Sequence, residues 1–300
     1  LAMSRLLAGD YAAAWPEYQW RWKTAEYAPR RRAFPQPEWL GHRALVGRTI
    51  LLHAEQGFGD TLQFCRYAPA VQALGATVVL EVPPALKRLL QGLPGTQQVV
   101  ARGESLPPFD FHCPLLSLPG ALGSTLDTLP TPIPYLRTDP TLVAGWAHRL
   151  GAGGRPRVGL AWAGNPGHGN DRNRSARLED LAPLLRPGCR FVSLQKALRG
   201  ADQAWMKRHA SAHAEFIHLG ADLGDFADTA ALVEQLDVVI TVDTAIAHLA
   251  GALGKLTWVL LPFAPDWRWL LDRRDSPWYP SMRLFRQRAT GDWGGVIGEV

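Results

Sequence analysis

The chain has 300 residues, of which 47% are hydrophobic and 20% charged, a composition typical of a globular protein and not of a disordered or fibrous one. This length predicts two domains, because a single hydrophobic core rarely grows so large. No apolar run is long enough to span a bilayer and no signal peptide is recognisable, so we expect a cytoplasmic protein, with the inner face of the membrane as a peripheral location.

Arginine supplies most of the net charge of +5 and of the pI near 9.3. The sequence has no basic stripe interleaved with aromatic residues and no nucleic-acid module, so we expect no nucleic-acid partner. The charge favours acidic small molecules, such as nucleotide diphosphates, or an anionic membrane face. The three cysteines lie in or beside apolar segments without C-x-x-C spacing, which predicts buried thiols in a reducing compartment at Cys65, Cys113 and Cys189.

Residues 1–26 have apolar and aromatic side chains at helical spacing, with one glycine-centred break. The pattern resembles the second half of a tetratricopeptide repeat, and one half-repeat cannot bury its own face. Because Leu1 is not a methionine, we expect that further repeats precede it and offer a surface to protein partners. Residues 27–41 form a proline-rich connector. The residues that carry the repeat-like pattern are Gly9, Tyr11, Ala14 and Tyr18.

From residue 48 to about residue 136, short β-like runs alternate with helix-like runs. This alternation predicts a parallel sheet with helices on both faces. The expected strands are 49–53, 77–82, 97–100 and one within 109–118, and the expected helices are 61–75 and 84–93.

Pro130, Pro132 and Pro134 mark a hinge, after which the same alternation recurs. We therefore expect two Rossmann-like, doubly wound α/β lobes, at residues 42–140 and 141–300, after a helical appendage and connector at residues 1–41. In the second lobe the expected strands are 157–164, 190–195, 216–220, 238–242 and 257–262, and the expected helices are 178–186, a long region after 195, 229–236 and 245–253.

One strand end leads directly into a helix after the apolar run 238–242. The helix start exposes unpaired backbone N–H groups and the positive end of the helix dipole, at the edge where open α/β sheets bind ligands. Asp243 or Thr244 can cap this helix, and His248 lies one turn further on the same face. The junction predicts an anion site.

A second junction of this kind follows the run 49–53. Gly57 and Gly59 would let the backbone turn sharply and approach a ligand closely. The third glycine and the acidic residue of the dinucleotide fingerprint are missing, which disfavours a nicotinamide-dependent oxidoreductase. Asp60, in the first turn of the following helix, is either a helix N-cap or a catalytic base.

The two junctions together resemble glycosyltransferase family 9, which includes the lipopolysaccharide heptosyltransferases. The segments are H-A-E-Q-G-F-G-D-T from His53 and D-T-A-I-A-H-L-A-G-A-L-G from Asp243. More closely, the chain resembles the C-terminal region of bacterial tetratricopeptide-repeat proteins that carry such a domain. The resemblance spans roughly residues 45–290. Ala245 stands where the family usually has glycine; its N–H remains available, although glycine would allow a closer approach.

The resemblance implies the GT-B fold, in which the last helix crosses back onto the first lobe, here the segment after Pro280. It also implies inverting transfer of a sugar from a nucleotide-diphosphate sugar to a glycan, lipid or protein hydroxyl. Asp60 matches the family's catalytic aspartate and should face the crevice across from Thr244. Glu55 and His53 are competing bases, because both lie at the same strand end.

The second lobe should bind the donor diphosphate, and the first should bind the acceptor. Backbone N–H groups at Thr244 and Ala245, the helix dipole and His248 would face the phosphates. The family places a cation from the loop after Trp162 there, for which Arg174 is the best match and Arg172 the second. With these groups a divalent metal is unnecessary, and we expect neither a metal nor a cofactor. Further candidate donor-binding residues are Gly57, Gly59, Asn165, Gln195, Lys196 and Asp243.

Aromatic residues crowd the end of the chain, and we expect most of them in the core or in lobe–lobe packing, with one sugar-stacking platform as the alternative. His112 is expected to be a structural histidine. A second class of function is a catalytically weak or inactive module that binds a nucleotide or a protein partner beside the upstream repeats. The aromatic residues are Trp267, Trp269, Trp278 and Tyr279.

Overall fold

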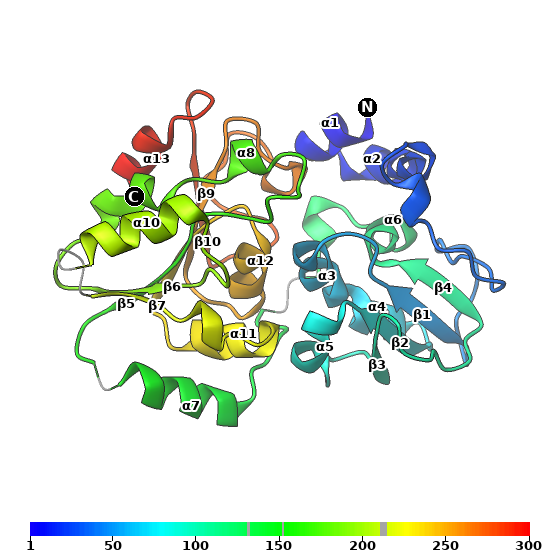
Figure 1. Cartoon of the computed structure of the whole chain (residues 1–300). Helices are drawn as coiled ribbons and strands as arrows, with labels where there is room; N and C mark the ends of the chain where they lie inside the picture. Colours follow the sequence, from blue (N-terminus) through cyan, green and yellow to red (C-terminus); the bar gives the residue numbers. More distant parts are fainter. Residues whose placement is uncertain (131–132, 152, 211–214) are drawn as a thin grey trace. The chain divides into compact units, whose positions relative to one another are not determined.

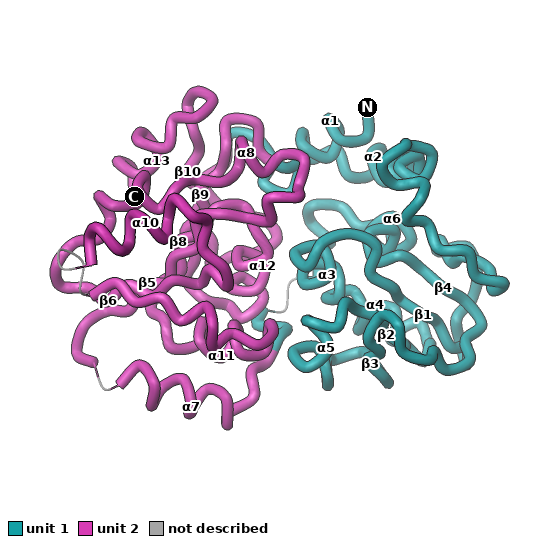
Figure 2. The backbone as a smooth tube through the Cα atoms, viewed as in Figure 1, with its two compact units in different colours: residues 1–136, 266–272 teal, residues 137–265, 273–300 magenta. Residues whose placement is uncertain are grey.

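The computed structural model of the chain describes residues 1–130, 133–151, 153–210 and 215–300. The chain forms two compact units (Figure 2). Unit 1 comprises Leu1–Leu136 and Asp266–Asp272, and unit 2 comprises Arg137–Pro265 and Arg273–Val300. Each unit is built around its own sheet, in which every strand pairing is parallel.

The sheet of unit 1 has the strand order β3-β2-β1-β4. Its strands are apolar because both faces are covered, as parallel sheets require. Phe34 from the proline-rich connector, with Leu106 and Phe109, packs on one face. The elements of the sheet are β1 (Thr49–His53), β2 (Thr77–Val82), β3 (Gln98–Ala101), β4 (Phe111–Pro114), α3 (Phe58–Phe64), α4 (Ala68–Ala73), α5 (Pro84–Leu90) and α6 (Leu118–Ala121).

The single helix predicted at 61–75 is divided into α3, a 3-10 turn at Cys65–Tyr67 and α4. Pro69 lies in the first turn of α4, where a residue without an N–H group is tolerated but a continuous helix is not. Helix α3 begins at Phe58, three residues earlier than expected, and Gly57 is its N-cap. Asp60 is therefore the third residue of the helix and not its cap.

The N-terminal helices α1 (Ala2–Leu7) and α2 (Tyr11–Tyr18) meet at Gly9, whose φ of +84° suits glycine. A 3-10 turn at Gln19–Lys23 follows, and another lies at Ala28–Arg30. This region was expected to be a separate appendage, but it lies within unit 1. Its aromatic residues surround Trp267, with ring centroids 6.0, 5.6 and 6.5 Å away for Tyr11, Trp15 and Tyr18.

The sheet of unit 2 has the order β7-β6-β5-β8-β9-β10, which is the doubly wound dinucleotide-fold order 3-2-1-4-5-6. Helices α9, α10 and α13 share a core with one face, and α7, α11 and α12 pack together, with α12 also on β8 and β9 (Figure 1). The strands are β5 (Arg157–Ala161), β6 (Arg190–Ser193), β7 (Phe216–His218), β8 (Val238–Val242), β9 (Thr257–Leu261) and β10 (Met282–Arg286). The helices are α7 (Pro140–Leu150), α8 (Asp171–Arg174), α9 (Leu178–Leu181), α10 (Gly200–His209), α11 (Phe226–Glu234), α12 (Ala245–Ala252) and α13 (Trp293–Glu299).

The end of the chain corrects one expectation. The segment after Pro280 does not return to unit 1: β10 pairs with β9, and Trp293, Val296 and Ile297 of α13 are buried in the core of unit 2. The segment that joins unit 1 is instead Asp266–Asp272. The expected boundary at 140/141 falls inside α7, a helix that the sequence pattern did not indicate, whereas unit 2 begins at Arg137.

Two expectations from the sequence concern membrane-spanning segments and the state of the cysteines. No helix among the described residues is long and apolar enough to cross a membrane. All three cysteines are free; Cys65 and Cys113 are buried, and Cys189 is partly exposed. Burial raises the pKa of the Cys65 thiol to about 12, so this thiol is unreactive.

Because Trp267 is only 3% exposed and fills a space lined by rings of unit 1, Trp267→Ala should lower the free energy of unfolding of unit 1 by about 3–5 kcal/mol. Urea denaturation measures this. Trp20→Ala is the matched control, because Trp20 is 64% exposed and its loss should change stability by less than about 0.5 kcal/mol. Equal effects of the two substitutions would contradict the packing role of Trp267.

Candidate functional site

Each sheet has one place where the strand order reverses. In unit 1 it lies between β1 and β4, and in unit 2 between β5 and β8. At such a point the connections leave in opposite directions, so the turns at the carboxyl ends of the two strands part and leave room for a ligand. Most of the residues predicted from the sequence lie at these two strand edges.

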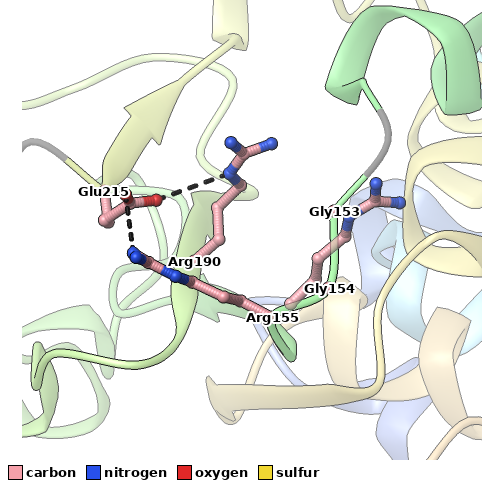
Figure 3. A pocket seen from close by; sticks show the side chains of 6 residues that line it. Gly153, Gly154, Arg155, Arg190 and Glu215 are labelled. Atoms are coloured by element: carbon pink, nitrogen blue, oxygen red, sulfur yellow. Dashed lines mark hydrogen bonds and ion pairs between the residues drawn. The ribbon is translucent and has the colours of Figure 1, made fainter.

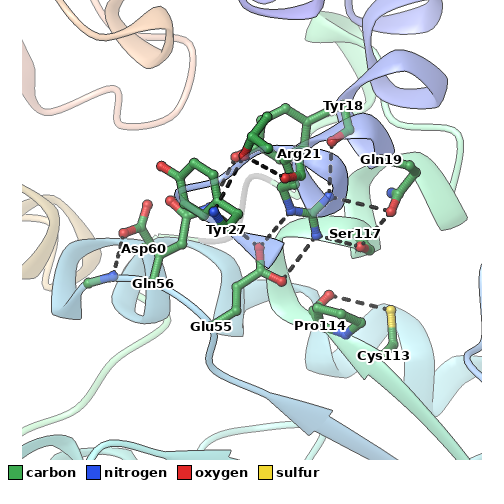
Figure 4. A network of polar contacts seen from close by, with 12 residues as sticks. Tyr18, Gln19, Arg21, Tyr27, Glu55, Gln56, Asp60, Cys113, Pro114 and Ser117 are labelled. Atoms are coloured by element: carbon green, nitrogen blue, oxygen red, sulfur yellow. Dashed lines mark hydrogen bonds and ion pairs between the residues drawn. The ribbon is translucent and has the colours of Figure 1, made fainter. Parts of the chain in front are cut away.

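At the first reversal, Asp60 projects from the first turn of α3. Its Oδ2 accepts a hydrogen bond of 2.8 Å from the Gly57 N–H (Figure 4), and its Oδ1 is ion-paired with Arg268. The side chain remains 19% exposed. Asp60 is therefore both an acceptor for the N–H of the N-cap residue and a carboxylate that solvent can reach.

Glu55, a competing base, belongs to a buried ion pair. The guanidinium of Arg21 donates to both carboxylate oxygens at 3.0 Å, and to Ser117 Oγ at 2.8 Å (Figure 4). Both side chains are at most 4% exposed. Burial raises the pKa of Glu55, while the charge of Arg21 opposes that shift. This arrangement ties the N-terminal helices to the ends of β1 and β4 and favours a structural role for Glu55.

His53, the other competing base, is 2% exposed. Its Nε2 lies 3.2 Å from Nδ1 of His112, and Phe34 packs against both rings. Burial, followed by the charges of His112, Arg32, Arg102 and Arg21, lowers the pKa of His53 to about 3. A histidine with so low a pKa is a poor proton acceptor at neutral pH. His112 is a buried structural partner, as expected.

The two glycines of this junction do not form the expected sharp turn. Gly57 has φ −76° and ψ 176°, an extended conformation open to any residue, and Gly59 lies inside α3. A side chain at Gly57 would begin 3.2 Å from Oδ2 of Asp60. Gly57 thus provides a backbone N–H and space for the Asp60 carboxylate, and neither glycine forms a phosphate-cradling loop.

At the second reversal, Thr244 is the N-cap of α12, and its hydroxyl accepts from the Ile246 N–H at 3.3 Å. Asp243 is the residue at the end of β8, and Ala245 is the first residue of the helix. The backbone N–H groups of the first turn therefore lie at the carboxyl edge of the sheet, where the sequence analysis expects the diphosphate.

Arg174 links the two strand ends at this reversal. Its Nη1 donates to the backbone carbonyl of Asp243 at 3.0 Å, and its guanidinium lies against Gly164, where a Cβ atom would be 2.7 Å from Nη2. Its Nε is buried and has no hydrogen-bond partner among the described residues. An unsatisfied buried donor needs an explanation, and an anionic ligand is one.

A second arginine, Arg199, lies at this carboxyl edge of the sheet, and the sequence did not indicate it. Its Nη2 pairs with Oδ2 of Asp171 at 2.6 Å and donates to the Gly164 carbonyl at 3.2 Å. Ser175 Oγ accepts from the Gly164 N–H and donates to the same carboxylate. The loop after β5 is thereby held in a single arrangement. The charged loop was visible in the sequence, but the contact with Arg199, 28 residues after Asp171, was not.

The remaining donor-site candidates have local partners. Asn165 is exposed, and its side chain accepts from the Gly167 N–H in a turn. Gln195 accepts from the Ala163 N–H at 3.2 Å, so it supports the loop after β5. Lys196 donates to the Gly224 carbonyl at 2.7 Å. Arg172 is exposed on α8.

His248 has a packing role. It is 5% exposed, and its Nδ1 lies 3.1 Å from the hydroxyl of Tyr279. The pair holds α12 to the segment before β10, which argues against direct contact of the histidine with a diphosphate. Trp267, Trp269, Trp278 and Tyr279 are all at most 3% exposed, so they belong to the cores, and none offers a sugar-stacking face.

A small cavity of unit 2 lies elsewhere. This open pocket of about 230 Å³ lies beside Gly153, Gly154 and the arginines at the amino ends of β5 and β6 (Figure 3). Glu215 accepts from Arg155 at 2.9 Å and faces Arg190 at 3.6 Å. None of the predicted residues lines it. Within the described part of the chain, no three His, Cys, Asp or Glu side chains are grouped to hold a metal ion.

Comparison with solved structures identifies the fold. A glycosyltransferase of family 9 from Veillonella parvula superimposes with a TM-score of 0.58 at 10% identity, over 82% of this chain and 87% of that chain. The E. coli ADP-heptose lipopolysaccharide heptosyltransferase II gives 0.56 at 15% identity, over 84% and 97%. The chain therefore has the two-sheet α/β fold of these glycosyltransferases, as the sequence predicts.

One curated relative is also similar in sequence. Protein FlbA of Caulobacter vibrioides is 29% identical over an alignment 320 residues long, gaps included, which covers 98% of this chain and 52% of the relative. The chain thus spans about half the length of that relative. No family model matches the chain.

Because Glu55 is buried against Arg21, Arg21→Met leaves an unpaired buried carboxylate and should lower the free energy of unfolding by about 3–5 kcal/mol. The double variant Arg21→Met/Glu55→Leu removes both charges and should recover much of this loss. Chemical denaturation of the two variants measures the difference. Arg177→Met, which breaks an exposed pair in unit 2, should leave the midpoint unchanged. A double variant as unstable as Arg21→Met would contradict the structural role.

Proposed function

We propose that this protein transfers a glycosyl group, with inversion, from a nucleotide-diphosphate sugar to a hydroxyl of a glycan, lipid or protein. The single observation that carries the proposal is Arg174, whose buried Nε, beside the start of α12, lacks a partner among the described residues. A guanidinium and a row of backbone N–H groups at a strand-order reversal are suited to a diphosphate. The name of the E. coli neighbour, an ADP-heptose transferase, makes an ADP-sugar the first donor to test.

In the proposed reaction, the Asp60 carboxylate takes the proton of the acceptor hydroxyl as its oxygen attacks the anomeric carbon. The bond from that carbon to the donor diphosphate breaks, and the electron pair leaves on the diphosphate oxygen. Attack opposite the leaving group inverts the anomeric configuration. Arg174 and the N-terminus of α12 offset the charge that develops on the leaving group, a task that in other enzymes falls to a metal ion. We propose that none is required here.

The location and the partners of the protein are part of the same proposal. A cytoplasmic protein has access to nucleotide sugars, and its positive charge suits the inner face of an anionic membrane. Upstream helical repeats would bring a protein partner or acceptor to the site. A binding module without turnover is the second candidate, and it is favoured by one observation: both oxygens of Asp60 already have hydrogen-bonding partners.

Donor binding can be tested at Arg174. Arg174→Gln removes a charged donor and should raise the Kd for the nucleoside diphosphate that binds the parent about 10–100-fold. Isothermal titration with ADP, UDP and GDP gives the Kd, and a thermal melt checks the fold. Arg172→Gln, an exposed neighbour on the same helix, is the control and should bind like the parent. Unchanged affinity in Arg174→Gln would place the diphosphate elsewhere.

Catalysis can be tested at Asp60. Asp60→Asn retains the size of the side chain and can still accept from the Gly57 N–H, but it cannot take a proton. It should therefore lower kcat about 10²–10⁴-fold with little change in donor KM. Release of nucleoside diphosphate from ADP-, UDP- and GDP-sugars, with glycan, lipid and protein acceptor fractions, measures turnover. Asp127→Asn, at an exposed position of unit 1, is the control. If the parent binds nucleotide sugars without turnover, the binding-module function is the correct one.

A further inference from the structure

Residues Asp266–Asp272 are a short strap that leaves unit 2 in sequence and belongs to unit 1. They contain one 3-10 turn, at Trp267–Trp269. The strap ends with two non-glycine residues at positive φ, Leu270 at 54° and Asp272 at 51°. Such conformations are uncommon and persist only where packing enforces them. The strap is therefore held firmly in this arrangement.

Trp267 anchors the strap. Its ring packs against Trp15 and Tyr11 of the N-terminal helices and lies 6.3 Å, centroid to centroid, from Phe64 of α3. Trp269 is fully buried as well. Two anchored indoles on either side leave the side chain between them little freedom. That side chain is Arg268.

Arg268 reaches the proposed catalytic carboxylate. It is 7% exposed, and three of its nitrogen atoms have separate partners. Nε donates to Gln63 Oε1 at 2.6 Å, Nη1 donates to Asp266 Oδ1 at 2.8 Å, and Nη2 pairs with Oδ1 of Asp60. The planar guanidinium also lies 4.5 Å from the ring centroid of Trp267. Arginine suits this position because its fork can hold several partners at fixed angles.

The guanidinium of Arg268 keeps its positive charge. Burial by itself would lower the pKa of Arg268, but the carboxylates of Asp266 and Asp60 raise it above its ordinary value. The guanidinium is thus a permanent cation beside Asp60. Together with the Gly57 N–H on Oδ2, it restricts rotation of the carboxylate, while the 19% exposure of Asp60 leaves an approach for a hydroxyl.

We propose that Arg268 is the positioning residue for Asp60: it holds the carboxylate oriented toward the acceptor hydroxyl. This role rests on the proposed glycosyl transfer. Because the strap is anchored on α2, the N-terminal helices are required for the reactive geometry, and not only for stability. In this role Arg268 acts on Asp60 and not on a substrate, so its effect should pass entirely through Asp60.

A double-mutant cycle in the full chain tests this role, with kcat and donor KM measured for each variant. Arg268→Gln should lower kcat about 10–100-fold, the cost of a misplaced catalytic group, and leave donor KM unchanged. Asp60→Asn/Arg268→Gln should be no slower than Asp60→Asn alone, because a residue that acts through another adds nothing once that one is gone. Arg273→Gln, just beyond the strap, removes an arginine whose side chain pairs with nearby Asp275, and should behave as wild type.

Arg268→Lys keeps the experiment conclusive if Arg268→Gln misfolds, because lysine retains the charge but cannot hold three partners at fixed angles. Its kcat should lie between those of wild type and Arg268→Gln, at unchanged donor KM. Multiplicative losses in the double variant, or full kcat in Arg268→Lys, would overturn the role of Arg268 while the transferase function stands. A wild-type chain without turnover would instead overturn the proposed function, and the role of Arg268 with it.

Discussion

Parallel strand pairing is the constraint on which the rest of this structure depends. In a parallel sheet every strand must be followed by a crossover, so all the turns after the strands gather at one edge. Where the strand order reverses, two of these turns separate. Asp60 and Arg21 lie near that point in unit 1, and Arg174 lies there in unit 2. The location of both candidate sites therefore follows from the topology, and the residues in the turns supply the chemistry.

Buried arginines complete the sites. Arg21 and Arg268 are each less than 10% exposed, and each pairs with a buried or partly buried carboxylate. Desolvation of such ions is costly, and pairs of this kind add little net stability over apolar substitutes. A geometric role explains their presence beside the first strand-order reversal, because a bidentate or forked guanidinium holds carboxylates at defined angles. One of these carboxylates, Glu55, joins elements together, and the other, Asp60, remains open to solvent.

The distribution of partners separates structure from chemistry among similar residue types. His53 and His248 are buried against a second ring. Asp60 is instead partly exposed, and Arg174 has a buried nitrogen with no hydrogen-bond partner in the described part of the chain. The exposure of Asp60 leaves an approach for a hydroxyl, and the unmet donor of Arg174 has a reason to bind an anion. This difference leaves Asp60 and Arg174 as the residues on which the proposed transfer rests.

The sequence by itself determined the two alternating α/β patterns and the two strand-to-helix junctions with Asp60 and Thr244, because these features depend on neighbours within a few residues. The resemblance to a known family singled out Arg174, in the loop after Trp162. Only the tertiary structure decided that Glu55 and His53 are buried in pairs and that the strap at Asp266–Asp272, not the last helix, joins unit 1. Arg268 lies 208 residues from Asp60. No local period or motif encodes such a contact, because it depends on the packing of distant segments around Trp267.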